Sequence, residues 1–307
     1  MIGVILAAGD GTRLKKSTGQ DICKPLRKIN NTHLIEFALN NLIELSVTEV
    51  YIVVGKQGNL IKDAIGDKYQ GLEIHYVCQR EQKGLMNALV QALKVIENDE
   101  TVILQLSDEI FVGLNTEAIK SALKDGTSDF YCGVTFEENP QKIKNNFSVE
   151  MDENSVLVKC IEKPQVVTNN IKGTGFTIFS GKVQKLIKET YESEPNKLYD
   201  LCDSSNYLTA SGYIGSALFV AEREFNINTA SDLNNLTIII SHLHKDHYGE
   251  LLSLGYATYV FHNLGCLKNR IKVYIPEEKT GNTAVDYKDK EKCELLLPIN
   301  KSIGYSF

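Results

Sequence analysis

Two glycines near the start of the chain have the type and spacing that a phosphate-binding loop requires. The sequence LAAGDGTRL places Gly9 and Gly11 at the end of an apolar run, residues 1–9, that is typical of a buried strand. Glycine lets backbone N–H groups approach a phosphate closely, and open α/β sheets bind ligands beyond the carboxyl ends of their strands. A dinucleotide fingerprint would need a third glycine where Leu14 stands, and a Walker loop would need Gly-Lys-Ser/Thr, which is absent. Taken alone, the two glycines also fit an ordinary tight turn.

Motifs further along the chain extend this loop into a longer pattern. GVILAAGDGTRL, followed by Lys24-Pro25-Leu26, resembles the signature of the sugar-phosphate nucleotidyltransferases, the enzymes that make nucleotide sugars. Further segments similar to that family follow in its order and cover about residues 1–236. They are CQREQKGLMNAL, LQLSDEI, IEKP, GTGF and NINTASDL. Order and spacing together argue against a chance similarity.

The resemblance implies nucleotidyl transfer, in which a phosphate oxygen of the acceptor attacks the α-phosphorus of a nucleoside triphosphate (NTP) and expels pyrophosphate. Both reactants are anions, so the site must neutralise charge and align them. By resemblance, Arg13 clamps the departing pyrophosphate and Lys24 stabilises charge at the α-phosphate. Solvated loop cations are the alternative for both. The nucleotide-binding residues that the resemblance implies are Ala8, Gly9, Gly11, Thr12, Gln79 and Gly84.

The resemblance also implies a metal site and an acceptor site. Asp108 and Asn226 would bind Mg²⁺, which takes a few hard oxygen ligands and bridges the phosphates. Many family members carry Asp where this chain has Asn226, although the N-acetylglucosamine-1-phosphate uridylyltransferases are similar in using Asn. Lys163 would hold the acceptor phosphate, with Glu162 and Gly175 beside it. The alternatives are a surface carboxylate for Asp108 and a turn-closing role for Lys163.

Two departures from the family pattern bear on the substrates. Where the family often reads LGD, this chain has Ser107 before the metal ligand, and where sugar-specific members tend to have Tyr-Gly-Val it has Asn146-Phe147-Ser148. The bulky Phe147 would crowd a hexose laid against the backbone. A cytidylyltransferase acting on phosphocholine or an aminoalkyl phosphonate is therefore the alternative within the same chemistry. The amide of Gln79 can hydrogen-bond a base edge and favours uracil or thymine.

A second cluster of potential ligands lies in SHLHKDHYG, which carries His242, His244, Asp246 and His247 after an apolar run. The spacing resembles the metallo-β-lactamase motif, whose imidazoles and carboxylate hold metals that activate water. Residues 237–307 are fewer than the roughly 100–150 residues of a usual domain. We therefore expect only part of that fold here, and whether the four residues bind Zn²⁺ is left undecided. The alternative from another class is a metal-dependent hydrolase with a nucleotide-binding N-terminal module.

The elements that must position these residues follow from hydrophobic periodicity. Residues 1–128 alternate apolar strands with amphipathic helices, which implies right-handed βαβ units and a parallel sheet covered on both faces. After a polar loop over residues 10–24, the expected helices are 34–45, 59–65 and 84–95, and the expected strands are 49–55, 72–78 and 101–106. Closely spaced strand-like runs over 129–180 indicate a mixed or antiparallel extension. Helices near 183–191 and 199–210 and a strand near 214–220 then complete the first part.

The expected fold class is therefore α/β, with a Rossmann-like doubly wound, mostly parallel sheet. A nucleotidyltransferase domain over residues 1–236 would precede a short α/β appendage over 237–307 that resembles part of a metallo-β-lactamase.

The composition places the chain among globular proteins. A hydrophobic fraction of 43% supplies a proper core, and a formal charge of −6 offers no bulk attraction to nucleic acid or anionic membranes. Seven cysteines without a Cys-x-x-Cys pair indicate reduced, mostly buried thiols. The start MIGVILAAG lacks a basic leader and its apolar run is short, so we expect a cytoplasmic enzyme. The expected partners are an NTP and a phosphorylated small molecule, with homo-oligomerisation left open.

Overall fold

The computed structural model describes residues 1–19, 23–29, 32–97, 99–229 and 232, together with the backbone of two short strands at 237–239 and 272–274. The chain divides into two compact units. The first comprises Met1–Lys15 and Gln20–Asn226, and the second comprises Lys16–Gly19 and Ile227–Phe307. The domain boundary expected near residue 236 stays a prediction.

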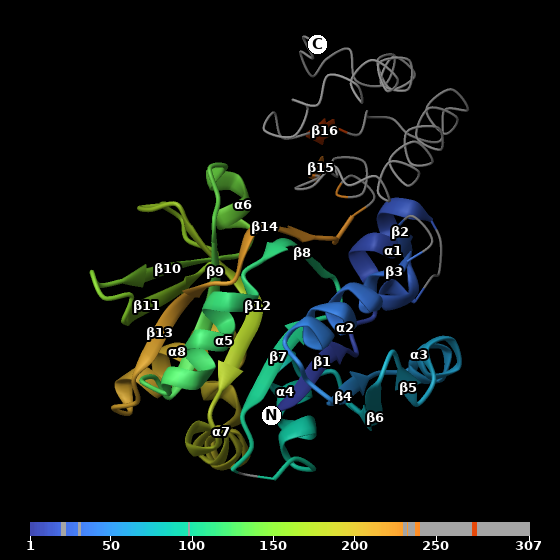
Figure 1. Cartoon of the computed structure of the whole chain (residues 1–307), viewed down its shortest axis with the longest axis horizontal. Helices are drawn as coiled ribbons and strands as arrows, with labels where there is room; N and C mark the ends of the chain where they lie inside the picture. The colour runs from blue at the N-terminus through green and yellow to red at the C-terminus, as the bar shows by residue number, and fades with distance from the viewer. Residues whose placement is uncertain are drawn as a thin grey trace, which may run out of the picture. The chain divides into compact units, whose positions relative to one another are not determined.

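The elements alternate strands and helices through the first half of the chain (Figure 1). The strands are β1 (Ile2–Ala7), β2 (Lys28–Ile29), β3 (Thr32–His33), β4 (Glu49–Val54), β5 (Lys68–Tyr69), β6 (Leu72–Cys78), β7 (Val102–Leu106), β8 (Glu109–Leu114), β9 (Phe130–Phe136), β10 (Phe147–Met151), β11 (Leu157–Glu162), β12 (Ile171–Phe179), β13 (Gly215–Phe219), β14 (Ala221–Asn226), β15 (Thr237–Ile239) and β16 (Lys272–Tyr274). The helices are α1 (Thr12–Thr18), α2 (Leu34–Glu44), α3 (Gly58–Ile65), α4 (Leu85–Leu93), α5 (Thr116–Asp125), α6 (Pro140–Lys144), α7 (Gly181–Ser193) and α8 (Leu201–Ala210), with 3₁₀ turns at Lys24–Leu26 and Pro195–Lys197.

A parallel sheet forms the centre of the first unit. Strand β1 pairs in parallel with β4 on one side and with β7 on the other, and β4 pairs in parallel with β6. Every residue of β1 is buried, as expected for a strand covered on both faces. The predicted strands over 1–9, 49–55, 72–78 and 101–106 are thus confirmed, and their carboxyl ends meet along one edge of the sheet.

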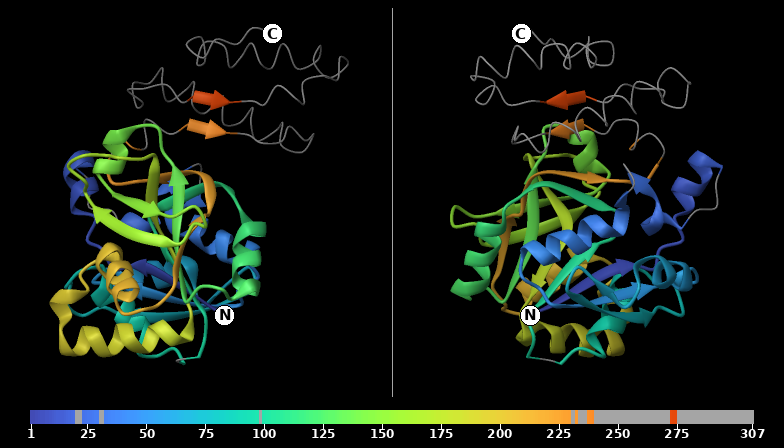
Figure 2. Two further views of the ribbon diagram at one scale, coloured as in Figure 1. Left: turned by 90° about the vertical axis from the view of Figure 1, so that its left-hand side faces the viewer. Right: turned by 45° about the vertical axis from the view of Figure 1, so that its right-hand side comes forward.

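An antiparallel extension continues the sheet beyond β7. Strand β12 runs antiparallel to β7, β9 and β10, and β10 runs antiparallel to β11, while β13 pairs in parallel with β9. The path of neighbouring strands is β11-β10-β12-β7-β1-β4-β6-β5, with β9 and β13 branching from β12. The mixed extension predicted over 129–180 is confirmed (Figure 2).

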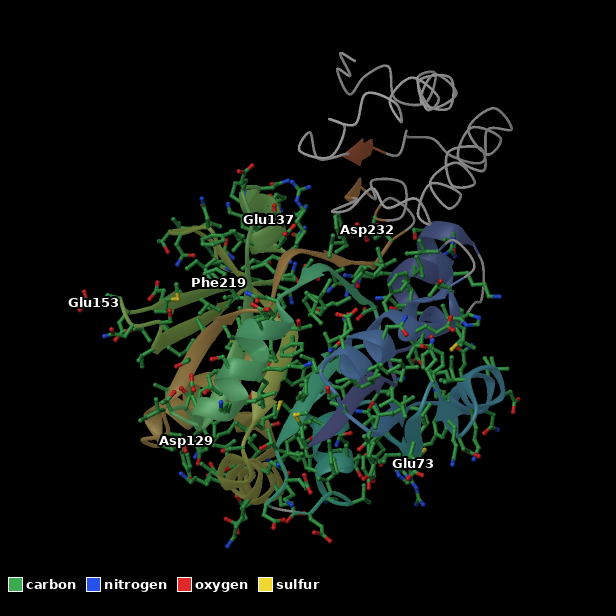
Figure 3. All side chains as sticks on the ribbon, in the orientation of Figure 1. Glu73, Asp129, Glu137, Glu153, Phe219 and Asp232 are labelled. Atoms are coloured by element: carbon green, nitrogen blue, oxygen red, sulfur yellow. The ribbon has the colours of Figure 1, made fainter. Side chains whose placement is uncertain are left out.

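Two hydrophobic cores lie on opposite faces of this sheet. Apolar side chains of α4, α7 and α8 form one core with the sheet, represented by Leu89, Ile187 and Leu208, which are all fully buried. Side chains of α2, α3 and α5 form the other. Covering both faces with helices is the doubly wound arrangement, so the predicted α/β fold class is confirmed. Charged side chains such as Glu73 and Glu153 lie at the periphery (Figure 3).

The structure corrects the expected loop over residues 10–24, because Thr12–Thr18 form helix α1. The segment TRLKKST buries only Leu14, so its apolar periodicity is too weak to predict a helix. Strands β8 and β14 and helix α5 were not predicted either. The caps of α5 carry a signal that could have found it, because Asn115 accepts a hydrogen bond from Ala118 N at its start and Gly126 adopts a left-handed conformation at its end.

The cysteines of the first unit behave as predicted. Cys23, Cys132, Cys160 and Cys202 are buried and Cys78 is exposed, and all five are free thiols. Cys266 and Cys293 lie outside the described residues. None of the helices that the structure describes is long and apolar enough to cross a membrane.

In the second unit, Thr237–Ile239 and Lys272–Tyr274 pair as parallel strands. The side chains of the motif His242, His244, Asp246 and His247 lie outside the described residues, so the predicted zinc site there is untested.

Candidate active site

Three of the predicted site segments begin where parallel strands end. Ala8 follows β1, Gln79 follows β6, and Asp108 lies two residues after β7. Hydrogen bonds between the strand ends fix this edge, since Gln79 N donates to Val54 O at 2.9 Å and Ser107 N donates to Leu6 O at 3.2 Å. Ligands of open α/β sheets bind along this edge.

The glycine loop packs directly against Lys24. Gly11 has a φ of 60°, which favours glycine, and a Cβ atom added to it would lie only 3.0 Å from the Cβ of Lys24. Lys24 begins a 3₁₀ turn in which Pro25 fixes the backbone, and its ammonium forms an ion pair with the carboxylate of Asp108. The side chains of Lys24 and Asp108 are 12% and 21% exposed, so both are shielded yet reachable. The fold thus brings Lys24 and Asp108 into contact, although they are 84 positions apart in the sequence.

The residues at the start of α1 complete the glycine loop. Gly9 and Arg13 are exposed, and Thr12 opens the helix. Gln82 reaches across from the next predicted segment, because its Nε2 donates to Ala8 O at 2.9 Å and to Asp10 Oδ1 at 2.8 Å. The loop after β1 and the loop after β6 are therefore joined by hydrogen bonds.

Gln79 and Gly84 lie together on the expected base-binding side. The Nε2 of Gln79 donates to Gly84 O at 3.1 Å and to Asn87 Oδ1 at 2.9 Å, so this amide is held in a fixed orientation. Gly84 has a φ of 95°, and a Cβ added there would lie 3.2 Å from the ring of Tyr199. Asn87 and Tyr199, which were not predicted as site residues, thus shape the place where the base is expected.

The expected acceptor residues lie on the antiparallel extension. Glu162 ends β11, and Lys163 follows with a φ of 43°, an uncommon conformation for a residue that has a side chain. The ammonium of Lys163 lies 3.0 Å from the carboxylate of Glu162 and is 68% exposed, so it is available to an anion. Strand β10 places Phe147 directly opposite Glu162.

Phe147 is buried, with 8% exposure, and its ring covers the backbone of Gly173. A Cβ added to Gly173 would lie 1.8 Å from the Phe147 Cε2 atom, so no space remains between the ring and the β12 backbone. A hexose cannot lie against that face of Gly173. The ring itself belongs to the hydrophobic core, where it packs with its neighbours instead of standing free in the acceptor space.

This contact yields a stability prediction. We expect Gly173→Ala to destabilise the protein by about 1–3 kcal/mol, because the added methyl group forces the buried ring of Phe147 to move. Gly9→Ala is the control, since no atom lies within 4 Å of a Cβ added there, and its effect should stay within about 0.5 kcal/mol. Urea unfolding of both variants measures the difference. Equal stability of the two variants would contradict the packing described.

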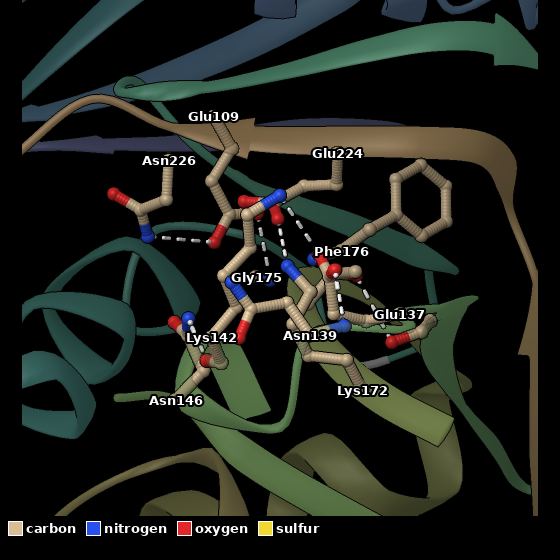
Figure 4. Close-up of polar contacts among 12 residues, drawn as sticks. Glu109, Glu137, Asn139, Lys142, Asn146, Lys172, Gly175, Phe176, Glu224 and Asn226 are labelled. Atoms are coloured by element: carbon tan, nitrogen blue, oxygen red, sulfur yellow. Dashed lines mark hydrogen bonds and ion pairs between the residues drawn. The ribbon is translucent and has the colours of Figure 1, made fainter. Parts of the chain in front are cut away.

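A group of buried charges lies beside Asp108. Glu109 lies on β8 and Glu224 on β14, and these two strands pair as an antiparallel ribbon. Lys172 on β12 forms an ion pair with Glu224 (Figure 4). Burial raises the pKa of Glu109 well above its ordinary value, and the neighbouring carboxylates Glu224 and Asp108 raise it further. Burial also raises the pKa of Glu224, while Lys172 opposes that rise. Lys172 is thus the counter-charge of this buried group.

Glu109 connects this group to two predicted site residues. Its Oε2 accepts a hydrogen bond from Gly175 N at 2.8 Å, and its Oε1 accepts one from Asn226 Nδ2 at 3.4 Å. A Cβ added to Gly175 would lie 2.3 Å from Leu106 Cγ, which explains why glycine is needed there. The backbone N–H of Gly175 is therefore used within the protein, and the predicted contact of Gly175 with the acceptor stays a prediction.

A family model described as nucleotidyl transferase matches residues 2–216 of the chain. The chain belongs to this family. The nucleotidyltransferase is 28% identical over 213 residues to the UTP–glucose-1-phosphate uridylyltransferase AglF of Haloferax volcanii, covering 69% of this chain and 85% of the relative. It is 27% identical over 200 residues to the glucose-1-phosphate thymidylyltransferase of Neisseria meningitidis, covering 64% and 68%.

Solved structures show the same fold. A structure described as a glucose-1-phosphate thymidylyltransferase of Bacillus anthracis superposes on 76% of this nucleotidyltransferase and 92% of its own chain, with a TM-score of 0.66 and 20% identity. The matched family confirms the predicted resemblance over the first part of the chain. The predicted likeness of residues 237–307 to a metallo-β-lactamase is not shown by any of these similarities.

Proposed function

We propose that this nucleotidyltransferase transfers a nucleoside monophosphate from an NTP to a sugar 1-phosphate and releases pyrophosphate. The observation that carries the proposal is the contact between Lys24 and Asp108 at the carboxyl ends of β1 and β7, beside the glycine loop. This arrangement joins a cation for phosphate, a carboxylate for a metal ion and a loop of accessible backbone. The two curated relatives are named for transfer to glucose 1-phosphate, which supports the substrate class.

Each basic residue then has a task in neutralising and aligning the anions. Lys24 would stabilise the charge that develops at the α-phosphate, since its side chain packs against Gly11 and its ammonium pairs with Asp108. Arg13, exposed at the start of α1, would bind the departing pyrophosphate through its forked donors. Lys163 would hold the phosphate of the acceptor, whose oxygen attacks the α-phosphorus in line with the leaving group.

The family is generally dependent on a divalent metal ion, Mg²⁺. The two expected ligands fit this ion chemically, because the carboxylate of Asp108 and the amide oxygen of Asn226 are hard oxygen ligands. No group of three His, Cys, Asp or Glu side chains within the described residues is arranged to hold a metal. Mg²⁺ is commonly held by one or two carboxylates together with substrate phosphates, so two protein ligands suffice. When bound, the ion would neutralise charge on the phosphates.

The experiment is a pyrophosphate-release assay with each of the four common NTPs and dTTP, in Mg²⁺, against a panel of phosphorylated acceptors. We expect release with at least one sugar 1-phosphate, with UTP or dTTP favoured through Gln79. Phosphocholine and aminoalkyl phosphonates with CTP form the second arm of the panel, because Phe147 fills the space over Gly173. Release only in that arm would replace the sugar acceptor with the smaller one, and no release with any pair would overturn the proposal.

Lys163→Met gives a separate prediction about the acceptor. We expect the KM for the acceptor to rise about tenfold to a hundredfold while the KM for the NTP changes little, since the ammonium is worth about 1.5–3 kcal/mol to a phosphate. Lys159→Met on the preceding strand β11 is the matched control, because its side chain is also exposed. Initial rates with each substrate varied in turn measure the two constants. An unchanged acceptor KM would remove Lys163 from the site.

A substitution in the second cluster distinguishes nucleotidyl transfer from the hydrolase alternative. His244→Ala should leave pyrophosphate release near the wild-type rate, whereas a hydrolase centred on the second cluster would lose its activity in that variant. Elemental analysis checks the same point independently, because a catalytic zinc centre would retain the metal after purification.

A further inference from the structure

The ribbon formed by β8 and β14 brings a buried carboxylate against the weaker of the two expected metal ligands. Asn226 is paired with Glu109 in the antiparallel register, and Asn226 Nδ2 donates to Glu109 Oε1 at 3.4 Å. Glu109 is only 3% exposed, although it directly follows the expected metal ligand Asp108. A glutamate in such a place needs a structural reason, because burying a carboxylate is costly.

Glu109 is held from both sides. Its Oε2 accepts from Gly175 N at 2.8 Å, and a Cβ added to Gly175 would lie 2.9 Å from that same oxygen. Lys172 lies close enough to lower the pKa of Glu109, although its ammonium pairs with Glu224. The carboxylate therefore has a fixed position, with one oxygen directed to the β12 backbone and the other to Asn226 (Figure 4).

The hydrogen bond also fixes which side of the amide faces outward. A side-chain amide has a donor side and an acceptor side, and an oxygen that accepts a hydrogen bond selects the donor side. The nitrogen of Asn226 faces Glu109, and its oxygen points away from it (Figure 4). A metal ion binds only the oxygen. Without an acceptor at position 109, the amide could turn and present its nitrogen instead.

We propose that Glu109 is a positioning residue that presents the Asn226 amide oxygen as a metal ligand, so that the two side chains work as a matched acceptor–donor pair. This inference rests on the proposed function, because it requires the metal site formed with Asp108. It predicts that the pair must change together: an aspartate at 226 has two equivalent oxygens and needs no partner to orient it. Glu109 would then lose its task.

A double-mutant cycle tests the pair by metal binding. Mn²⁺ affinity is measured by electron paramagnetic resonance in the presence of the α,β-methylene analogue of the NTP that supports turnover. We expect Glu109→Gln to weaken Mn²⁺ binding about tenfold to a hundredfold, the usual loss when a group that orients a ligand is removed. In the Asn226→Asp background, the same Glu109→Gln change should cause no loss, because its amide can donate to one aspartate oxygen and leave the other free.

Controls separate orientation from charge and from folding. Glu222→Gln removes a negative charge from an exposed position on the same ribbon and should leave Mn²⁺ affinity unchanged. Thermal unfolding of Glu109→Gln checks that the ribbon stays folded, and the recovery expected in the double variant provides the same check within the binding assay. A loss of equal size in both backgrounds, or no loss in either, would overturn the positioning role.

Asp108→Asn distinguishes failure of this inference from failure of the proposed function. If Asp108→Asn abolishes Mn²⁺ binding while Glu109→Gln has no effect, the metal site stands and the role of Glu109 falls. If Asp108→Asn leaves Mn²⁺ binding intact, the metal site itself is misplaced and both fall.

Discussion

Asp108→Asn should reduce kcat/KM for pyrophosphate release about a thousandfold. The substitution removes the charge of the expected Mg²⁺ ligand and the partner that holds Lys24 beside the glycine loop. Losing about 4 kcal/mol of transition-state stabilisation is the scale expected when a metal ion is no longer bound productively, and each 1.36 kcal/mol or so is a factor of ten in rate. Steady-state rates at several Mg²⁺ concentrations measure the effect.

The matched control for this substitution is Asp63→Asn on the exposed face of α3, which should retain wild-type activity. Both variants are isosteric with the natural residue and should unfold at similar temperatures. If Asp108→Asn kept more than a tenth of the activity, the metal site would have to lie elsewhere.

Lys172→Met should destabilise the protein by about 3–5 kcal/mol, the usual cost of leaving a buried carboxylate without its counter-charge. Its side chain is 3% exposed and that of its partner Glu224 is 2% exposed. Glu224 Oε1 already lacks a hydrogen-bond partner among the described residues, so little within the protein can compensate. Urea unfolding measures the loss as a lower midpoint with an unchanged slope.

Two further variants make this result specific. Lys182→Met removes an ion pair with Asp129, but its side chain is 78% exposed, so the loss should stay below about 1 kcal/mol. Adding Glu224→Leu to Lys172→Met should recover much of the stability, since replacing both members of a buried pair by apolar groups is often neutral. If Lys172→Met cost no more than Lys182→Met, the pair would contribute little to the fold.

The central sheet could be predicted because its signals are local. Runs such as IGVILA and VYIVV carry no charged residue, and each ends near a glycine, so both their type and their place in a parallel sheet follow from neighbouring residues. The motifs that contain Gln79 and Asp108 follow such strands, so they are placed at the carboxyl ends of the sheet. By contrast, the β8–β14 ribbon depends on pairing between residues 117 positions apart, as for Glu109 and Asn226.

Residues of the candidate site could be named from motifs for the same reason, and their roles stay predictions. Motif resemblance named Lys24 and Asp108 separately, but only the fold shows that they form an ion pair. Motif resemblance did not identify Glu109 as a site residue, because its partners Gly175 and Asn226 lie on two strands that are distant in the sequence. The ring of Phe147 was expected to crowd the acceptor, and its packing on Gly173, which decides what space it occupies, depends on the register of β10 against β12.

The proposed reaction breaks the bond between the α- and β-phosphates of the NTP. ³¹P nuclear magnetic resonance of a reaction containing Mg²⁺, UTP or dTTP, and glucose 1-phosphate tests it directly. We expect free pyrophosphate together with two coupled resonances from a new diphosphate that joins nucleoside to sugar. Orthophosphate and nucleoside diphosphate, formed by hydrolysis at the γ-phosphate, would contradict it.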